Sequence, residues 1–248
     1  MTLEEFFHQQ PRVALAFSGG VDSAYLLYEA ARLAQSVRAY YVKSPFQPQF
    51  ELEDAQRLAQ QLQVPLTVLP LDVLSDPQVA ANPSDRCYFC KRKIFTTLCS
   101  AAAADGFTTV LDGTNASDQA DDRPGMRALA ELSVRSPLRE CGLTKEEIRS
   151  RSRQAGLFTW DKPAYACLAT RIPTGQTITL QDLQRTEQAE GILFSMGFTD
   201  FRIRLLGDCA RLQLPSHQLP LLLDKREQLL SRLKPYYSAV LLDLEVRG

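Results

Sequence analysis

Histidine is scarce in this sequence: only His8 and His217 occur among its 248 residues. A Ser-His-Asp or Cys-His constellation needs a histidine in a specific arrangement, and a multi-histidine zinc site needs several. Two histidines nearly exclude both kinds of site. The chemistry of the protein must therefore depend on other side chains.

Long apolar runs are also missing, since no stretch approaches the roughly 18 residues that span a bilayer. The first residues, MTLEEFFHQQPRVALAF, place acidic side chains before the apolar run and have no basic segment, unlike a secretory signal. We therefore expect a cytoplasmic protein with no membrane partner. In that reducing compartment the six cysteines should be free thiols or metal ligands.

The sequence has no excess of charge of either sign, with a formal net charge of -1. Proteins that bind tRNA or DNA usually carry a clear basic excess, so a nucleic-acid partner is disfavoured. Hydrophobic residues make up 45% and charged residues 23% of the chain, the balance of a globular protein with a sizeable core. The length predicts one large and one small domain.

Strand-like and helical segments alternate through the first two-thirds of the chain. This order predicts βαβ units and a parallel sheet, that is, an α/β fold. Strands are predicted over 12–17, 37–42, 64–69 and 108–111, and helices over 21–34, 51–62 and 91–104. Thr144 and Glu147 form a capping box that should open a further helix, ending near Gly156.

The pattern changes from about Gly175 onward. A helix over 180–196 precedes two short β runs, 201–205 and 210–214, and the turn dipeptide Gly207-Asp208 between them is a hairpin signature. A helix over 219–233 and a strand over 239–244 should follow. We predict a first domain over 1–170 and a small α+β domain over 171–248, joined through 160–174.

The segment Ser18-Gly19-Gly20-Val21-Asp22-Ser23 follows the first predicted strand and opens the first long helix. Glycines permit close backbone approach, and a helix N-terminus offers unpaired N–H groups to an anion. An ordinary turn with an N-cap serine is the alternative, but six matched positions in this context favour phosphate binding. The loop lacks the Gly-Lys-Ser/Thr ending of a Walker A loop, so simple γ-phosphate hydrolysis is not indicated.

The loop resembles the SGGxDS motif of the PP-loop (N-type ATP pyrophosphatase) enzymes. The resemblance implies a parallel-sheet ATP pyrophosphatase domain that adenylates its substrate and releases pyrophosphate. It also implies that Asp22 is linked to Mg²⁺ and that Lys43, just past the second strand, contacts adenosine, although Lys43 could equally be a solvated lysine. The residues of the implied pyrophosphate cradle are Ser18, Gly19, Gly20 and Ser23.

Asp112-Gly113-Thr114-Asn115 follows the fourth predicted strand, at the sheet edge where open parallel sheets bind ligands. Gly113, Thr114 and Asp118 are therefore candidates for a nucleotide or metal role. A polar surface loop, continuing through the charged residues Asp121, Asp122 and Arg123, is the alternative.

Cys87-Tyr88-Phe89-Cys90 lies between a predicted loop and a predicted helix. A C-x-x-C can be a redox pair, half of a zinc site, part of an iron–sulfur site or incidental. No second C-x-x-C occurs, which argues against a closed four-cysteine zinc site. Cys167 could be an inert buried cysteine by its own context, and Cys99, Cys141 and Cys209 have no partner pattern.

Five separated blocks together resemble the LarE family over nearly the whole chain. They are SGGVDS, NPSDRCYFCK, DGTNASD with RPG, KPAYACLATRIPTG and FRIRLLGDCARLQL. The resemblance implies an ATP-dependent sulfur transferase that adenylates a carboxylate of a pyridinium mononucleotide and installs sulfur, a step in building the nickel-pincer cofactor. It therefore implies a small-molecule nucleotide substrate and hints at a homo-oligomer.

Members of this family that have only the late cysteine give up its sulfur and keep dehydroalanine, whereas others have three cysteines and hold a [4Fe-4S] cluster. This sequence has all three, Cys87, Cys90 and Cys167. The resemblance therefore implies a cluster on these thiols, with Cys167 as the reacting cysteine. Three thiolates leave one iron open for a hydrosulfide, which would permit repeated turnover.

The resemblance also implies a substrate site on the second domain. Arg202 and Arg204 share one face of a strand by the period-two rule and should hold the mononucleotide phosphate, unless they belong to a solvated face. Arg171 and Glu190 are further candidates. Gln213 stands where the family pattern leads us to expect a glutamate, which puts in doubt any ion site that needs that carboxylate.

Three other functions compete with this interpretation. A PP-loop tRNA thiolase would need a basic RNA surface. An amide-forming synthetase of the NAD or GMP synthetase type uses ammonia and leaves the C-x-x-C and Cys167 unexplained. A non-enzymatic adenine-nucleotide sensor leaves the same cysteines without a task.

Overall fold

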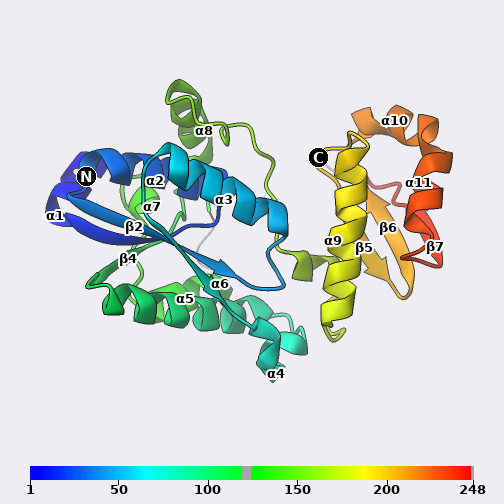
Figure 1. The fold of residues 1–248 in the computed structure, drawn as a ribbon, viewed down its shortest axis with the longest axis horizontal. Helices are drawn as coiled ribbons and strands as arrows, with labels where there is room; N and C mark the ends of the chain where they lie inside the picture. The colour runs from blue at the N-terminus through cyan, green and yellow to red at the C-terminus, as the bar shows by residue number, and fades with distance from the viewer. Residues whose placement is uncertain (119–123, 247–248) are drawn as a thin grey trace.

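A computed structural model describes residues 1–118 and 124–246 of the chain. It consists of two bodies placed side by side along the long axis of the molecule (Figure 1). The first contains a four-stranded sheet and the second a three-stranded sheet. Asp121, Asp122 and Arg123 lie outside the described residues.

The first sheet is parallel throughout, in the strand order β3-β2-β1-β4. Its strands are β1 (Arg12–Ala16), β2 (Ser36–Lys43), β3 (Leu66–Pro70) and β4 (Thr109–Leu111). The prediction of an α/β fold with a parallel sheet is confirmed, and each strand lies within two residues of its predicted bounds. β1 is central, so the loop that follows it opens at the middle of the sheet edge.

Helices cover both faces of this sheet, because side chains alternate between the faces along each strand. Leu15 and Tyr41 pack with α2 (Val21–Leu33) and α3 (Gln49–Gln61) on one face. Ala14 and Tyr40 pack with α5 (Arg86–Ala104) on the other. Figure 1 shows α2 and α3 on one side of the sheet and α5 on the opposite side.

Four helices of the first body were not predicted. They are α1 (Leu3–Gln9), α4 (Pro77–Ala80), α6 (Pro124–Glu131) and α7 (Pro137–Glu140). The signal for α1 was present, since Thr2 and Glu5 form a capping box. The capping box of Thr144 and Glu147 opens α8 (Lys145–Gln154), as predicted.

Helix α5 begins at Arg86, five residues before its predicted start at Lys91. Asp85 is its N-cap residue, so the preceding Pro83-Ser84-Asp85 segment leads directly into the helix. Leu98 and Ala102 lie one turn apart and pack with the sheet residues Ala14 and Tyr40, and Phe95, one turn earlier, is also buried. The earlier start places Cys87 and Cys90 inside the helix, one turn apart.

The second body contains the predicted hairpin. β5 (Arg202–Leu206) pairs antiparallel with β6 (Cys209–Gln213), and Gly207 in the turn has φ 59°. β7 (Ala239–Leu242) pairs parallel with β6. Helix α9 (Leu180–Ser195) lies across this sheet, and the single helix predicted over 219–233 is broken at Lys225 into α10 (Leu219–Asp224) and α11 (Arg226–Leu233).

One hydrophobic cluster crosses from the first body to the second. Phe46, Val79 and Cys90 of the first body pack in the same cluster as Leu193 and Ile203 of the second. Leu168, in the connecting segment, donates its backbone N–H to the Phe46 carbonyl at 2.9 Å. Within the described residues, no helix has the length and apolar character that crossing a membrane requires.

Candidate active site

The loop from β1 to α2 is built around two glycines and two serines. Gly19 has φ 73°, and a Cβ there would lie 3.0 Å from the Glu51 carbonyl oxygen. Gly20 is the N-cap of α2 with an extended backbone. The hydroxyls of Ser18 and Ser23 lie 3.0 Å apart, and Ser23 donates to the Gly20 carbonyl at 3.2 Å. This loop is fixed in shape before any anion binds.

The segment after β4 packs against the loop from β1 to α2. A Cβ at Gly113 would lie 2.9 Å from the Ser23 backbone nitrogen, so only glycine lets the two segments approach this closely. Asp112 accepts hydrogen bonds from Thr114 and, at 2.6 Å, from Ser136. Asp118 accepts the Asn115 N–H at 3.1 Å. Asp112 and Asp118 therefore hold the segment after β4 in place through these hydrogen bonds.

A cavity of about 550 Å³ lies between the loop, the strand ends and α5, a volume in the range of small-molecule sites. Ser18, Gly20, Asp22 and Ser23 line it on one side, and Gly113, Thr114 and Asp118 line it on another. Cys87 and Lys91 reach it from α5. Lys43 lies elsewhere, in a groove of about 630 Å³ beside α9.

A second cavity, of about 320 Å³, lies beside the same loop. It shares Ser18, Gly20 and Asp22 with the first cavity and is also lined by Cys167. Lysines complete it, since Lys145 and Lys162 both contribute. The loop therefore borders two cavities, the larger lined also by Cys87 and the smaller by Cys167.

Only one carboxylate oxygen of Asp22 has a polar partner in the described structure. Its Oδ2 lies 2.7 Å from Lys145 Nζ, while its Oδ1 is buried without a hydrogen-bond partner in the described structure. Glu51 lines the same small cavity, and burial raises the pKa of its carboxyl to about 7. The nearby charges of Lys162 and Arg171 oppose that rise but do not cancel it.

Two of the three candidate cysteines contact one guanidinium, and the third lies within electrostatic reach of them. Arg86 directs Nη1 at Cys167 Sγ at 3.9 Å and Nη2 at Cys87 Sγ at 3.7 Å. Burial raises the pKa of the Cys90 thiol to about 12, with further upward contributions from Cys167 and Cys87. The fold thus brings together thiols 77 residues apart in the sequence (from 90 to 167).

The thiols are not arranged as a metal site. Across residues 1–118 and 124–246, no three Cys, His, Asp or Glu side chains form a group that could hold a metal ion. Arg86, which is buried, contacts two of the three sulfurs. Its guanidinium would have to move before the three sulfurs could share a metal centre.

The predicted substrate residues surround the segment that carries Cys167. Arg171 and Glu190 form a fully buried ion pair, with Nε to Oε1 at 2.8 Å and Nη2 to Oε2 at 3.0 Å. Arg202 donates to the Ala164 carbonyl at 2.9 Å, and Arg204 donates to the Thr170 carbonyl at 2.8 Å. None of these four side chains lines either cavity at the loop.

Gln213 lies at the edge of this arrangement. It accepts a hydrogen bond from Arg204 Nε at 2.6 Å and donates to Asp243 at 2.8 Å. Asp243 therefore places a carboxylate next to Gln213.

Four residues near the loop were missed by sequence reasoning: Arg86, Lys145, Lys162 and Glu51. The first three had a signal, because Arg86 precedes Cys87, Lys145 follows the capping Thr144, and Lys162 begins the KPAYAC block. Glu51 had none, since its burial depends on the packing of α3 against the loop.

Comparisons with known proteins agree with this geometry. The asparagine synthase family matches residues 4–120. An uncharacterized Synechocystis protein, slr1717, is 40% identical over 88% of this chain and 81% of its own length. The pyridinium-3,5-bisthiocarboxylic acid mononucleotide synthase of Lactiplantibacillus plantarum is 34% identical over 84% of this chain and 76% of its own. The tRNA-specific 2-thiouridylase MnmA of Streptomyces avermitilis is 30% identical over 61% and 51%.

Proposed function

The chain belongs to the family of the pyridinium-3,5-bisthiocarboxylic acid mononucleotide synthase, the LarE family, and from this premise we propose that it is an ATP-dependent sulfur transferase of nickel-pincer cofactor synthesis. The observation that carries the proposal is the small cavity, which is lined both by Cys167 and by the loop from β1 to α2 (residues 18–23), called the phosphate loop below. A sulfur group and an adenylated acceptor need to meet beside that loop.

The proposed reaction has two steps. A carboxylate oxygen of the pyridinium mononucleotide attacks the α-phosphorus of ATP, and pyrophosphate leaves. A sulfur nucleophile then attacks the acyl carbon, and AMP leaves with the electron pair of the broken C–O bond. The loop supports the first step, because it leads into the N-terminus of α2, whose unpaired N–H groups can bind a polyphosphate.

Asp22 is the proposed Mg²⁺ ligand. Its buried Oδ1, which has no partner in the described structure, fits a cation that would satisfy it. Mg²⁺ prefers carboxylate and phosphate oxygens, so Asp22 would hold the ion beside the nucleotide. The bound ion would supply charge neutralisation of the phosphates.

Cys87, Cys90 and Cys167 are the proposed ligands of a [4Fe-4S] cluster. Their proximity supports the proposal, because Arg86 contacts both Cys87 and Cys167, and Cys90 lies one helical turn from Cys87. A cluster would take the place that the Arg86 guanidinium now occupies between those two sulfurs. A cluster held by three thiolates would have one iron without a protein ligand, and a sulfide could bind to that iron.

Anaerobic reconstitution should yield about four irons and four sulfides per chain, a stoichiometry set by the cluster type. Replacing Cys87 and Cys90 with Ser should abolish the ultraviolet–visible and EPR signals.

The deciding experiment combines enzyme, Mg-ATP and the dicarboxylated pyridinium mononucleotide. We expect AMP, pyrophosphate and a thiocarboxylate product, and Asp22→Asn should remove most of this activity while the circular dichroism spectrum is unchanged. Formation of ADP and phosphate would contradict the proposal.

The fate of Cys167 distinguishes the two sulfur sources. If Cys167 gives up its own sulfur, loss of H₂S leaves dehydroalanine, which is lighter than cysteine by roughly 34 Da. If sulfur arrives through the cluster, the peptide keeps its mass after turnover. We propose the second route, because Cys87 and Cys90 otherwise have no task; full multiple turnover by the protein with both changed to Ser would contradict it.

We also propose that the enzyme works in the reducing cytoplasm as a homo-oligomer. All six cysteines are free, which suits a reducing compartment. Leu241, Leu242 and Leu244 at the edge strand β7 and just beyond it are exposed, which suits contact with another copy. Light scattering after size exclusion would test the assembly, and a monomer at micromolar concentration would contradict it.

The tRNA thiolase remains a second candidate because of the similarity to MnmA. That similarity covers only 61% of the chain, and the net charge of -1 does not favour RNA. A salt-dependent gel shift with tRNA would support the thiolase and count against the proposal made here.

A further inference from the structure

Two lysines reach the small cavity from different elements beside the phosphate loop. Lys145 is the first residue of α8, and Lys162 lies in the segment that connects the two bodies. Both line the cavity together with Ser18, Gly20 and Asp22. The function proposed above gives neither lysine a role.

Each lysine is held by an aspartate. Lys145 Nζ lies 2.7 Å from Asp22 Oδ2, and Lys162 Nζ lies 2.8 Å from Asp54 Oδ2. Lys162 Nζ is also 3.4 Å from the Gly19 carbonyl, inside the loop itself. Two positive charges therefore stand at the loop, within reach of any anion that binds it.

Asp22 cannot keep Lys145 once a divalent cation arrives. The lysine occupies one carboxylate oxygen, and the other is buried and has no partner in the described structure. A cation bound to this carboxylate would stand close to the ammonium group. At that distance two positive charges in a partly buried site repel each other strongly. The ammonium would leave, and the nearest new anion would be the nucleotide phosphate on the adjoining loop.

We propose that Lys145 pairs with Asp22 until a divalent cation binds the other carboxylate oxygen, and that Lys145 and Lys162 then together bind the pyrophosphate end of ATP. The inference rests on the proposed use of ATP at this loop. Charge-assisted hydrogen bonds from two ammonium groups would hold the pyrophosphate while the α-phosphorus is attacked. The larger cavity is then left for the nucleoside.

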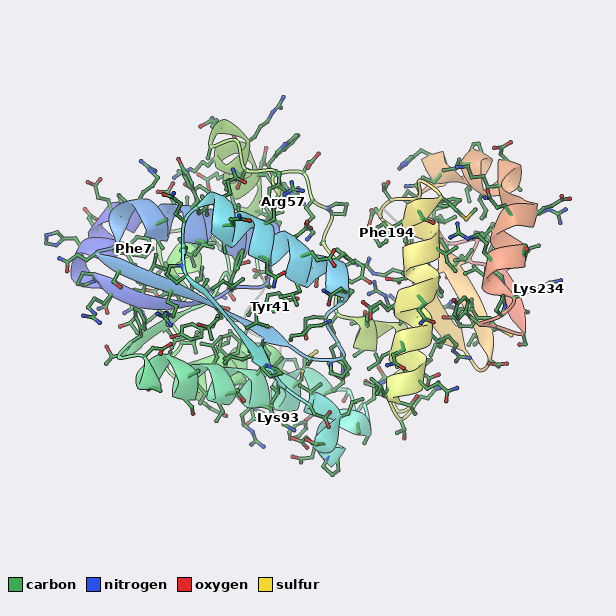
Figure 2. All side chains as sticks on the ribbon, in the orientation of Figure 1. Phe7, Tyr41, Arg57, Lys93, Phe194 and Lys234 are labelled. Carbon is green, nitrogen blue, oxygen red and sulfur yellow. The ribbon has the colours of Figure 1, made fainter. Side chains whose placement is uncertain are left out.

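Two binding measurements without acceptor test the inference. The variants are Lys145→Met, Lys162→Met and, as a matched control, Lys234→Met on the far side of the second body (Figure 2). Mn²⁺ binding to nucleotide-free protein is followed by EPR, and binding of inorganic pyrophosphate with Mg²⁺ by calorimetry. Circular dichroism checks the fold of each variant.

Lys145→Met should bind Mn²⁺ about threefold to tenfold more tightly, because a competing charge is gone, and should bind pyrophosphate about tenfold more weakly. Lys162→Met should weaken only pyrophosphate binding, and Lys234→Met should change neither. Lys145→Arg, which keeps the charge, should restore pyrophosphate binding.

Unchanged or weaker Mn²⁺ binding by Lys145→Met would overturn the proposed competition between Lys145 and the cation for Asp22. Unchanged pyrophosphate binding in both loop variants would overturn the phosphate role. Neither measurement involves the acceptor or sulfur. The inference therefore stands if pyrophosphate binds as expected but no thiocarboxylate forms, and in that case only the proposed function fails.

Discussion

At the scale of single residues, Gly113 shows how a missing side chain shapes the site. The loop after β4 approaches the phosphate loop so closely that an added Cβ would lie 2.9 Å from the Ser23 nitrogen. The nearest atoms are the backbone nitrogen, Cα and Cβ of Ser23, which cannot move aside without shifting the backbone. Gly191, on α9, has no atom within 4 Å of an added Cβ.

We predict that the substitution of alanine affects ATP binding at Gly113 but only stability at Gly191. Gly113→Ala should displace the loop and weaken ATP binding by about tenfold, since misplacing loop donors costs about 1–3 kcal/mol. Gly191→Ala should leave ATP binding unchanged and stabilise the protein by about 1 kcal/mol, because alanine is the better helix former. Calorimetric titration and urea unfolding measure the two effects; equal ATP affinity of the variants would contradict the prediction.

The ionisation of Glu51 should make stability depend on pH in the neutral range. Burial raises the pKa of its carboxyl to about 7 in the folded protein, although Lys162, Arg171 and Lys43 lower it and Asp54 raises it. The folded pKa lies above the ordinary value of 4.5. The folded state therefore retains its proton longer, and this contribution to stability is complete below pH 4.5 and lost as the pH rises through 7.

We predict that Glu51→Gln removes this pH dependence. The variant and the wild type should have similar free energies of unfolding near pH 4.5, whereas at pH 8 the variant should be more stable by about 3 kcal/mol. Urea denaturation from pH 4.5 to 8 measures the difference. A stability gap that does not widen with pH would contradict the assignment of the raised pKa to Glu51.

At the scale of elements, three arginines attach the Cys167 segment to the second body. Arg171 donates to the Ala166 carbonyl at 2.8 Å, Arg202 to Ala164 and Arg204 to Thr170. The hairpin strand β5 supplies Arg202 and Arg204, and α9 supplies Glu190, which also accepts the Ile203 N–H at 3.1 Å. Contacts with the second body thus help to position Cys167, in addition to the Leu168 N–H bond to Phe46 of the first body.

Glu190→Gln should destabilise the protein by about 3–5 kcal/mol, because it leaves the buried Arg171 guanidinium without a counter-charge. Glu227→Gln is the control, since its ion pair with Arg226 is exposed, with 62% and 89% of the two side chains accessible. The control should change stability by less than about 1 kcal/mol. Unfolding in guanidinium chloride compares the two variants. Similar unfolding midpoints for both would show that the buried ion pair does not stabilise the fold.

At the scale of the whole molecule, we propose two domains, 1–170 and 171–248, that do not unfold independently. Phe46 is fully buried in a cluster whose other members come mostly from the second body. Its carbonyl accepts the Leu168 N–H, and Arg86 lies over its ring at 5.4 Å. Figure 2 shows α9, which carries the labelled Phe194, at the side of the second body that faces the first.

Phe46→Ala should therefore uncouple the two domains. We expect the single calorimetric unfolding transition of the wild type to split or broaden, with a loss of about 3–5 kcal/mol. Phe6→Ala, which removes an equally buried ring from the first body alone, should lower the midpoint but keep one transition. If both variants unfold in one sharp transition, the cluster does not couple the domains.

Particular elements show where sequence reasoning succeeded. The strands β1 to β4, the capped helix α8 and the hairpin at Gly207 were predicted because periodicity, capping and turn residues are local signals. α6 was missed, and α10 and α11 were predicted as one helix, because short helices have weak periodicity and their boundaries depend on packing. The start of α5 was placed too late, since Pro83 and Asp85 indicate a loop equally well.

The sequence by itself determined the phosphate loop, the parallel sheet beneath it and the identity of the three cysteines, because each is carried by neighbouring residues. Only the tertiary structure decided that Cys167 faces that loop and that Arg86 stands beside Cys87 and Cys167. It also decided that Arg171 and Glu190 neutralise each other in the core and that Lys145 and Lys162 converge on one small cavity. Such contacts join residues far apart in the chain, and their partners are chosen by packing and burial rather than by sequence spacing.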